Sequence, residues 1–383
     1  MSTNPASGQA DLRVIDGHND LPIALRFFAD SSVANLDTGL PALNTDIPRL
    51  RAGQVGGQFW SVFVPTSLTG ADAVQATLEQ IDVVRRIAAR YPDTFRLARS
   101  ADEVEQARAD GLIASLLGAE GGHSIGDSLA VLRILAGLGL RYLTLTHNEG
   151  PSWAQSCLED PGTHGLTDFG REVVGELNRL GVLVDLSHTA TATMHAALDV
   201  SRAPVIFSHS SCRAVNDHVR NVDDAVLARL ADAGGLLMVT FVPAFISARY
   251  AEWEAADTAR RTDLGLGSPL VALDASRANS PAWQQLRRWR EANPAPEVSV
   301  TEVVAHLAHA RDVLGVDHLG LGGDYDGVPA MPDALRDVST YPVLLEALSG
   351  AGWSTADLDA LTWSNAVRVL RDADDVAASL NQR

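Results

Sequence analysis

Short apolar runs and longer amphipathic segments alternate along the chain, and this alternation predicts strands and helices in turn. The apolar runs are rich in Val, Ile, Leu and Phe, and they are as short as strands buried on both faces usually are. We predict eight strands, at Arg13–Asp16, Gln58–Val64, Leu112–Leu117, Tyr142–Thr146, Val182–Leu186, Val205–Phe207, Leu236–Phe241 and Leu319–Leu321.

Helical periodicity separates most of these runs, because apolar residues recur three and four positions apart. The predicted helices are Ala71–Ala89, Ser128–Leu138, Asp168–Leu180, Thr191–Leu198, Asp223–Ala231 and Val300–Leu314. Strand–helix alternation of this kind indicates an α/β protein whose parallel strands close into a (β/α)8 TIM barrel. The alternative is an open doubly wound sheet, which needs a glycine-rich phosphate-binding turn where this chain has His18-Asn19-Asp20.

The segment Tyr250–Glu297 interrupts this alternation, because it is charged and rich in Trp and Pro. We expect an insertion after the seventh strand, folded as one or two helices, on the side of the barrel where loops form active sites. It either covers the pocket or elaborates the surface. Helical patterns resume at Pro342–Leu348 and Thr355–Arg371, and no repeat or second domain is evident, so residues 1–383 are predicted to form one barrel domain.

Composition narrows the class of protein. With 383 residues, 46% hydrophobic content and a near-neutral mean hydropathy, the chain is typical of a soluble globular protein. Its formal net charge of -18 argues against partners such as nucleic acid or an anionic membrane surface. All 30 basic residues are Arg, which excludes a Schiff-base, phosphate-loop or metal-bridging lysine. Any carboxylate that bridges two metals must therefore come from Asp or Glu.

Cysteine use and the two ends of the chain predict a cytoplasmic location. Cys157 and Cys212 are too few for a disulfide framework. Residues 1–11 lack the apolar core of a signal peptide, and no stretch of about 18 apolar residues predicts a membrane span. The polar residues 377–383 do not resemble a lipid-anchor signal.

Chemically reactive side chains stand at the ends of six of the eight predicted strands. Active sites of TIM barrels form at the carboxyl ends of the strands, so these side chains are expected to meet. The strand ends concerned carry His18 and Asp20, Glu120, His147, His188, His209, and Asp324.

Four of these positions have the spacing of metal ligands. His18 and Asp20 are two apart on an extended segment, so both can reach one metal ion. His188 and His209 are one strand–helix–strand step apart and are expected on adjacent strands. Imidazole and carboxylate groups together suit zinc. Glu120 has two oxygens that can span two cations, and with the second histidine pair it makes a three-ligand site.

Other polar residues are candidates for catalysis or substrate binding. Asp324 is closer to its strand end than Asp326, so we prefer it as the proton-transfer group and expect Asp326 to cap the next turn, although the reverse assignment stays open. His147 either polarises a carbonyl oxygen or is structural. Arg220 either binds a substrate carboxylate or forms a surface ion pair. The helical His306 is interpreted as structural.

Five ordered stretches resemble the renal (membrane) dipeptidase family, the M19 peptidases of the amidohydrolase superfamily. The resemblance extends from about Val14 to Arg371, nearly the whole chain. The matching stretches are Ile15–Pro22, Glu120–His123, Asn178–His188, Ser201–Ser211 and Gly322–Val328.

The resemblance implies a barrel with two Zn²⁺ ions per chain, and it suggests a homodimer. His18 and Asp20 would bind one zinc, His188 and His209 the other, and Glu120 would bridge them. It further implies that His147 contacts the scissile carbonyl, Arg220 the terminal carboxylate, and that Asp324 is the acid/base residue. Because the chain lacks a recognisable signal, an anchor and more than two Cys, it is expected to be a bacterial cytoplasmic relative.

The resulting hypothesis is hydrolysis of dipeptides that end in a free carboxylate, with tolerance of a D-residue at that end. A metal-bridging hydroxide would attack the scissile carbonyl, and Asp324 would pass the proton to the leaving amine. One alternative is another amidohydrolase-type reaction on a lactone, ester or amide. A second is a catalytically silent zinc-binding or peptide-binding protein. The segment Tyr250–Glu297 is longer than the family minimum, so the preferred dipeptide stays open.

Overall fold

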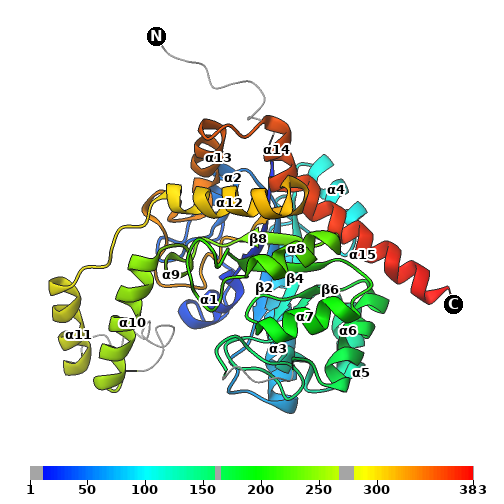
Figure 1. Cartoon of the computed structure of the whole chain (residues 1–383), viewed down its shortest axis with the longest axis horizontal. Helices are drawn as coiled ribbons and strands as arrows, with labels where there is room; N and C mark the ends of the chain where they lie inside the picture. The colour runs from blue at the N-terminus through cyan, green and yellow to red at the C-terminus, as the bar shows by residue number, and fades with distance from the viewer. Residues whose placement is uncertain (1–11, 160–164, 267–279, 383) are drawn as a thin grey trace, which may run out of the picture.

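A closed ring of parallel strands forms the centre of the molecule. The computed structural model describes residues 12–159, 165–266 and 280–382 (Figure 1). Eight strands pair around the ring in the order β1-β2-β4-β5-β6-β7-β8-β9, and β9 returns to β1. Residues Gly57 to Phe63 of β2 pair with Ala114 to Glu120 of β4 without a register shift, which closes the barrel. The predicted (β/α)8 architecture is confirmed, and the open sheet is excluded.

Each predicted run lies at a ring strand. The ring strands are β1 (Val14–Asn19), β2 (Val55–Phe63), β4 (Ile113–Glu120), β5 (Leu140–Thr144), β6 (Leu183–Asp185), β7 (Val205–Ser210), β8 (Leu236–Val239) and β9 (Leu319–Leu321). One strand was not predicted: β3 (Phe95–Leu97) pairs with the first residues of β4 and lies outside the ring. Its three residues are too few to show a period.

Helices surround the ring of strands, and several of them begin at a capping side chain. They are α1 (Leu21–Phe28), α2 (Ile47–Ala52), α3 (Gly70–Arg90), α4 (Ala101–Ala109), α5 (Leu129–Leu138), α6 (Asp168–Leu180), α7 (Thr191–Val200), α8 (Asp224–Asp232), α12 (Val300–Leu314), α13 (Tyr341–Gly350), α14 (Thr355–Asp359) and α15 (Asn365–Asn381). The side chains of Ser128 and Thr167 accept hydrogen bonds from backbone N–H groups in the first turns of α5 and α6. Left-handed Gly139 and Gly181 end the same two helices.

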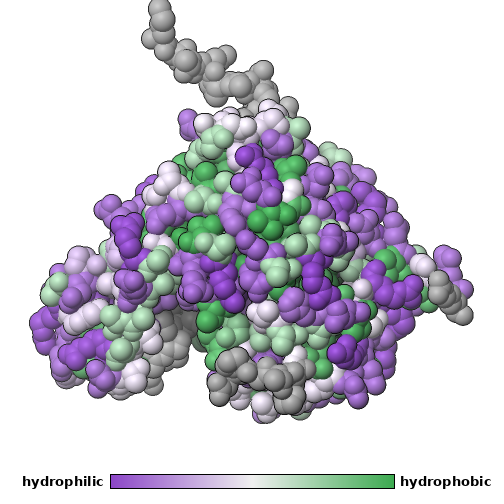
Figure 2. All heavy atoms as spheres, viewed as in Figure 1, coloured by the Kyte–Doolittle hydropathy of each residue, from purple (hydrophilic) through white to green (hydrophobic). Residues whose placement is uncertain are grey.

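The expected insertion follows β8, the seventh ring strand. It contains α9 (Pro243–Ile246), α10 (Ala248–Asp263) and α11 (Pro281–Ala292), and its residues 267–279 lie outside the described part. Helices α10 and α11 form an arm beside the barrel, which Figures 1 and 2 show as a separate lobe. The buried Asp257 pairs with Arg261 and Arg290 and so joins the two helices. The assignment of the whole chain to one domain stays a prediction.

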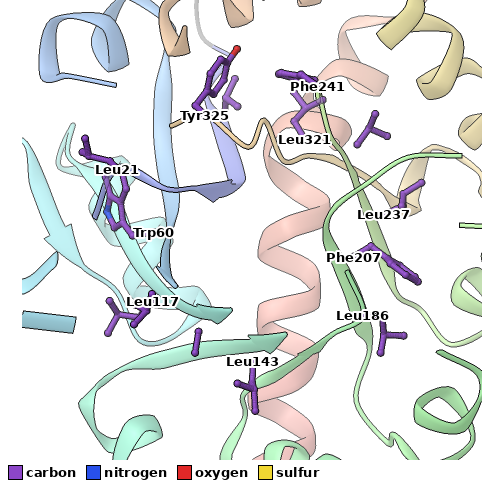
Figure 3. Packing of buried hydrophobic residues seen from close by; sticks show 14 of the residues in the cluster. Leu21, Trp60, Leu117, Leu143, Leu186, Phe207, Leu237, Phe241, Leu321 and Tyr325 are labelled. Carbon is purple, nitrogen blue, oxygen red and sulfur yellow. The ribbon is translucent and has the colours of Figure 1, made fainter. Parts of the chain in front are cut away.

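Two apolar clusters pack around and inside the barrel. Side chains such as Trp60, Leu143 and Phe207 are distributed around the ring and pack beneath the helices (Figure 3). Inside the ring, Tyr142 and Met238 belong to a second cluster that includes residues of α15, which covers the amino ends of the strands. Polar side chains at the carboxyl ends therefore face an open pocket. No helix in the described ranges is long and apolar enough to cross a membrane, and a cytoplasmic location stays a prediction.

Candidate metal centre

The five predicted ligands converge at the carboxyl ends of the strands. His18 lies near the end of β1, Glu120 ends β4 and His209 lies in β7. Glu120 Oε1 is within 3.1–3.6 Å of the Nε2 atoms of His18, His188 and His209. Asp20 Oδ2 is 3.3 Å from His18 Nε2. The structure therefore brings together all five side chains, and they are buried.

Hydrogen bonds fix the tautomer of two of the three histidines. His188 Nδ1 lies 3.1 Å from Asn148 Oδ1, which accepts its proton. His209 Nδ1 lies 2.8 Å from Ser208 Oγ, whose own hydroxyl donates to Asp185. Both Nε2 atoms are then unprotonated, and they lie 3.0 Å apart. Two lone pairs held this close fit a site that a cation occupies.

Burial keeps the same two imidazoles neutral, which metal binding requires. It lowers the pKa of His188 and of His209 well below the usual histidine value, and the positive charge of Arg220 adds to the effect. For Glu120, burial alone would raise the pKa, but neighbouring His18 and His147 hold it well below the usual range. His188 and His209 are therefore neutral imidazoles beside an ionised Glu120, and these are the forms that bind zinc.

His18 has a ring nitrogen that could serve as a further metal ligand. Its Nδ1 lies 2.8 Å from the Tyr142 hydroxyl, and its Nε2 is buried with no hydrogen-bond partner in the part of the chain described. Tyr142 reaches this position because residue 118 is Gly, where a Cβ would overlap the tyrosine ring. A buried nitrogen without a partner is costly unless a ligand satisfies it. The three histidine Nε2 atoms and the Glu120 carboxylate together thus fit a metal ion.

Two site residues have backbones that non-glycine residues rarely adopt. His188 has φ 67° and Asp324 has φ 64°, both in the left-handed region. Such conformations cost of order 1–3 kcal/mol each and collect at functional sites. Hydrogen bonds hold both turns: Asp185 accepts from Ser187 N, and Asp16 accepts from Gly323 N.

The predicted substrate residues line a cavity of about 160 Å³ above the ligands. His147, Arg220 and Asp324 contribute to its wall, together with apolar Ile23, Phe63, Phe245 and Val328. Burial, reinforced by Asp20 and Glu120, raises the pKa of Asp324 to about 8. Burial lowers the pKa of His147.

Arg220 does not form the surface ion pair that the sequence left open as an alternative. It is 3% exposed and pairs with no carboxylate among the described residues. Its guanidinium lies 5.1 Å from the centre of the Phe245 ring, and Nη2 donates to His209 O at 3.4 Å. A guanidinium held this way keeps further N–H groups for a ligand.

Asp326 lies outside the cavity lining. Its Oδ1 accepts a hydrogen bond from Asn44 N at 2.6 Å, so Asp326 anchors a loop that is distant in the sequence. The expectation that Asp326 caps the following turn is therefore wrong. Asp324 is therefore the aspartate of the pair that faces the cavity.

Five residues that support the predicted ligands or Arg220 were not predicted from the sequence. They are Tyr142, Asn148, Asp185, Ser208 and Phe245. Asp185 could have been noticed as an acidic residue inside the apolar run Val182–Leu186. Ser208 directly precedes a predicted ligand, but serine at such a position is common and carries little information by itself.

Comparison with known proteins agrees with this geometry. The model of the membrane dipeptidase family, peptidase family M19, matches residues 8–383. An uncharacterised dipeptidase from Schizosaccharomyces pombe is 40% identical, and the alignment covers 96% of this chain and 83% of that protein. Dipeptidase 3 of Mus musculus is 38% identical, and the alignment covers 96% of this chain but only 65% of that protein. These relatives are eukaryotic, so they do not support the expected bacterial origin.

Solved structures show the same fold. Dipeptidase AC, a metallopeptidase of family M19, is 26% identical with a TM-score of 0.77, covering 95% of this chain and 99% of that one. A metallopeptidase from Rhodobacter sphaeroides, solved with a phosphinate mimic of L-Ala-D-Ala, is 24% identical with a TM-score of 0.78, covering 94% and 99%. From the family model and the relatives together, we conclude that the chain belongs to the membrane dipeptidase family of metallopeptidases, peptidase family M19.

Proposed function

We propose that this protein is a binuclear zinc dipeptidase that hydrolyses dipeptides with a free C-terminal carboxylate. The observation that carries the proposal is the meeting of five buried ligand side chains beneath a cavity walled by Asp324 and Arg220. The family supplies the reaction class, and the cavity of about 160 Å³ favours small substrates.

The ligands divide into two sets. His18 and Asp20 would hold one zinc ion, His188 and His209 the other, and Glu120 would bridge them. When bound, two zinc ions lower the pKa of a water and polarise the scissile carbonyl. The free Nε2 atoms and the low pKa of Glu120 support this assignment.

Three residues would act on the substrate directly. Asp324 accepts a proton from the attacking water and gives it to the departing amine, a role supported by its position in the cavity wall beside Asp20 and Glu120. His147 donates a hydrogen bond to the carbonyl oxygen as negative charge develops there. Arg220 binds the terminal carboxylate, which limits the substrate to one residue beyond the cleaved bond. We further propose that a D-residue is accepted at that end.

The test is turnover of L-Ala-L-Ala and L-Ala-D-Ala by zinc-loaded protein, with bound zinc counted in the same sample. Wild type should hydrolyse at least one of them with about two zinc ions per chain. D324N should keep both ions and lose at least about 100-fold in rate, whereas D326N should stay active. Two bound zinc ions without dipeptide turnover would contradict the proposal and favour an ester, lactone or amide substrate.

A further inference from the structure

A second polar cavity lies at the end of the barrel opposite the metal centre. Its volume is about 260 Å³, and Arg13, Arg51 and Arg108 line it. The remaining lining residues stand at or near the amino ends of strands, among them Val55, Gly56, Thr94 and Ile113. Because all the ring strands are parallel, amino-end residues cannot contribute to the site at the carboxyl ends.

This cavity is lined by three guanidinium groups and no carboxylate. Within the described ranges, none of these three arginines pairs with an acidic side chain, whereas nearby Arg96 pairs with Asp110. The chain as a whole has a net charge of -18. A local concentration of unneutralised positive charge is therefore unexpected here and indicates a position for an anion.

Contacts on one side hold each arginine while leaving N–H groups free. Arg51 Nη2 donates to Thr94 Oγ1 at 3.0 Å, and Arg13 Nη1 donates to Leu12 O at 3.2 Å. The guanidinium of Arg108 lies 4.5 Å from the Trp363 ring centre. A guanidinium has five N–H donors, so most of the fifteen in this cluster make no hydrogen bond to the described residues.

The helix ends do not fully explain this cluster. Arg51 and Arg108 lie in the last turns of α2 and α4, where the helix dipole favours a cation. Arg13 precedes a strand, where no such dipole acts, and yet it lines the same cavity. The helix dipoles therefore explain Arg51 and Arg108 one by one, but they do not explain why Arg13 lines the same cavity.

We propose that this cavity binds a small multivalent anion that carries phosphate or carboxylate groups. Guanidinium groups pair with both kinds of oxyanion in a planar, two-pronged geometry. Three positive charges match a multivalent anion better than a monovalent one. This proposal does not depend on the dipeptidase reaction, because it uses none of the residues of the metal centre.

The test is calorimetric titration of the zinc-loaded protein with inorganic phosphate and, separately, with succinate. Wild type should bind at least one of them saturably, and R51Q/R108Q should bind that anion at least about tenfold more weakly. Any binding of phosphate at the metal centre is common to both proteins, so the difference reports on the arginine cavity. If only phosphate binds more weakly to the variant, the natural anion carries phosphate groups; if only succinate does, it carries carboxylates.

R86Q is the matched control, since half-buried Arg86 pairs with Asp82 and lies outside the cavity. It should bind like wild type. A wild-type temperature of thermal unfolding shows that R51Q/R108Q is folded. If the double variant does not fold, R51Q alone is measured, because Arg51 is exposed. Equal affinity of wild type and the arginine variants, or no saturable binding by wild type, overturns the proposal.

Discussion

Ser208 connects His209 to the buried carboxylate of Asp185. Its hydroxyl donates to Asp185 Oδ2 at 2.6 Å, and its oxygen lies 2.8 Å from His209 Nδ1. Asp185 also accepts from Thr144 Oγ1 at 2.6 Å and from Ser208 N at 2.8 Å. One carboxylate therefore joins the ends of β5, β6 and β7 and sets the tautomer of a proposed zinc ligand.

The first prediction concerns this connection. S208A removes the acceptor for His209 Nδ1–H, so the Nε2 tautomer becomes accessible and the ring is less well oriented. Zinc affinity should fall by about 10- to 100-fold, measured by competition with a chromogenic chelator. S115A is the control, because Ser115 is a buried serine on β4 whose Oγ has no hydrogen-bond partner in the described residues. Equal zinc affinity in S208A and S115A would show that the connection has no role in metal binding.

A second prediction follows from the close approach of Gly327 to two carboxylates. A Cβ at residue 327 would lie 2.5 Å from Asp324 Oδ1 and closer still to Asp20 Oδ2. G327A should therefore displace both side chains and lower the turnover of dipeptides by about 100-fold, as small misplacements of reacting groups do.

The control for this change is G350A. Nothing lies within 4 Å of a Cβ built at Gly350, which ends α13 on the outside of the barrel. It should leave turnover unchanged. Wild-type turnover by G327A would mean that Asp20 and Asp324 tolerate a shift, which contradicts their proposed roles.

A third prediction tests recognition of the terminal carboxylate. R220Q removes the charge, and the loss of a charged hydrogen bond of about 1.5–3 kcal/mol should raise KM for a dipeptide by about 10- to 100-fold. The corresponding dipeptide amide should be a poor substrate for both proteins. R213Q is the control, since Arg213 lies on the same loop outside the cavity and donates to Val219 O. An equal effect of R220Q on dipeptide and amide would contradict carboxylate recognition.

The residues at the strand ends could be predicted from the sequence, because all strands of a parallel barrel end on the same side. Each apolar run is a strand, and the residue after it must stand at the same end of the ring. His18, Glu120 and His209 could therefore be assigned to one site from periodicity alone, before any contact between them was known.

Contacts that depend on register or on distant loops could not be predicted in this way. Asp326 was expected to act locally, yet its partner Asn44 lies 282 positions away in the sequence. The Tyr142 hydroxyl reaches His18 only because Gly118 on the neighbouring strand leaves space for the ring. Such pairs depend on which side chains face each other across strands, and the period of a single strand does not contain that information.

The last prediction concerns stability and pH. His306 is fully buried in α12, where Nδ1 accepts from Cys212 N at 3.1 Å and Nε2 donates to Ile246 O at 3.3 Å. Both ring nitrogens are thus used by the neutral imidazole. Burial lowers the pKa of His306 from 6.5 to about 4. Between these values the unfolded chain binds a proton that the folded protein does not, so stability falls as pH drops below 6.5.

At pH 5 the expected loss relative to pH 7.5 from this one group is about 2 kcal/mol. H306N keeps an oxygen acceptor for Cys212 N and removes the titration. Urea unfolding at the two pH values should therefore show a larger decrease in the free energy of unfolding for wild type than for H306N, whatever the absolute stabilities. If both proteins lose the same free energy on acidification, the pKa of His306 is the same in the folded and the unfolded chain, and the acid sensitivity of the fold must come from other buried groups.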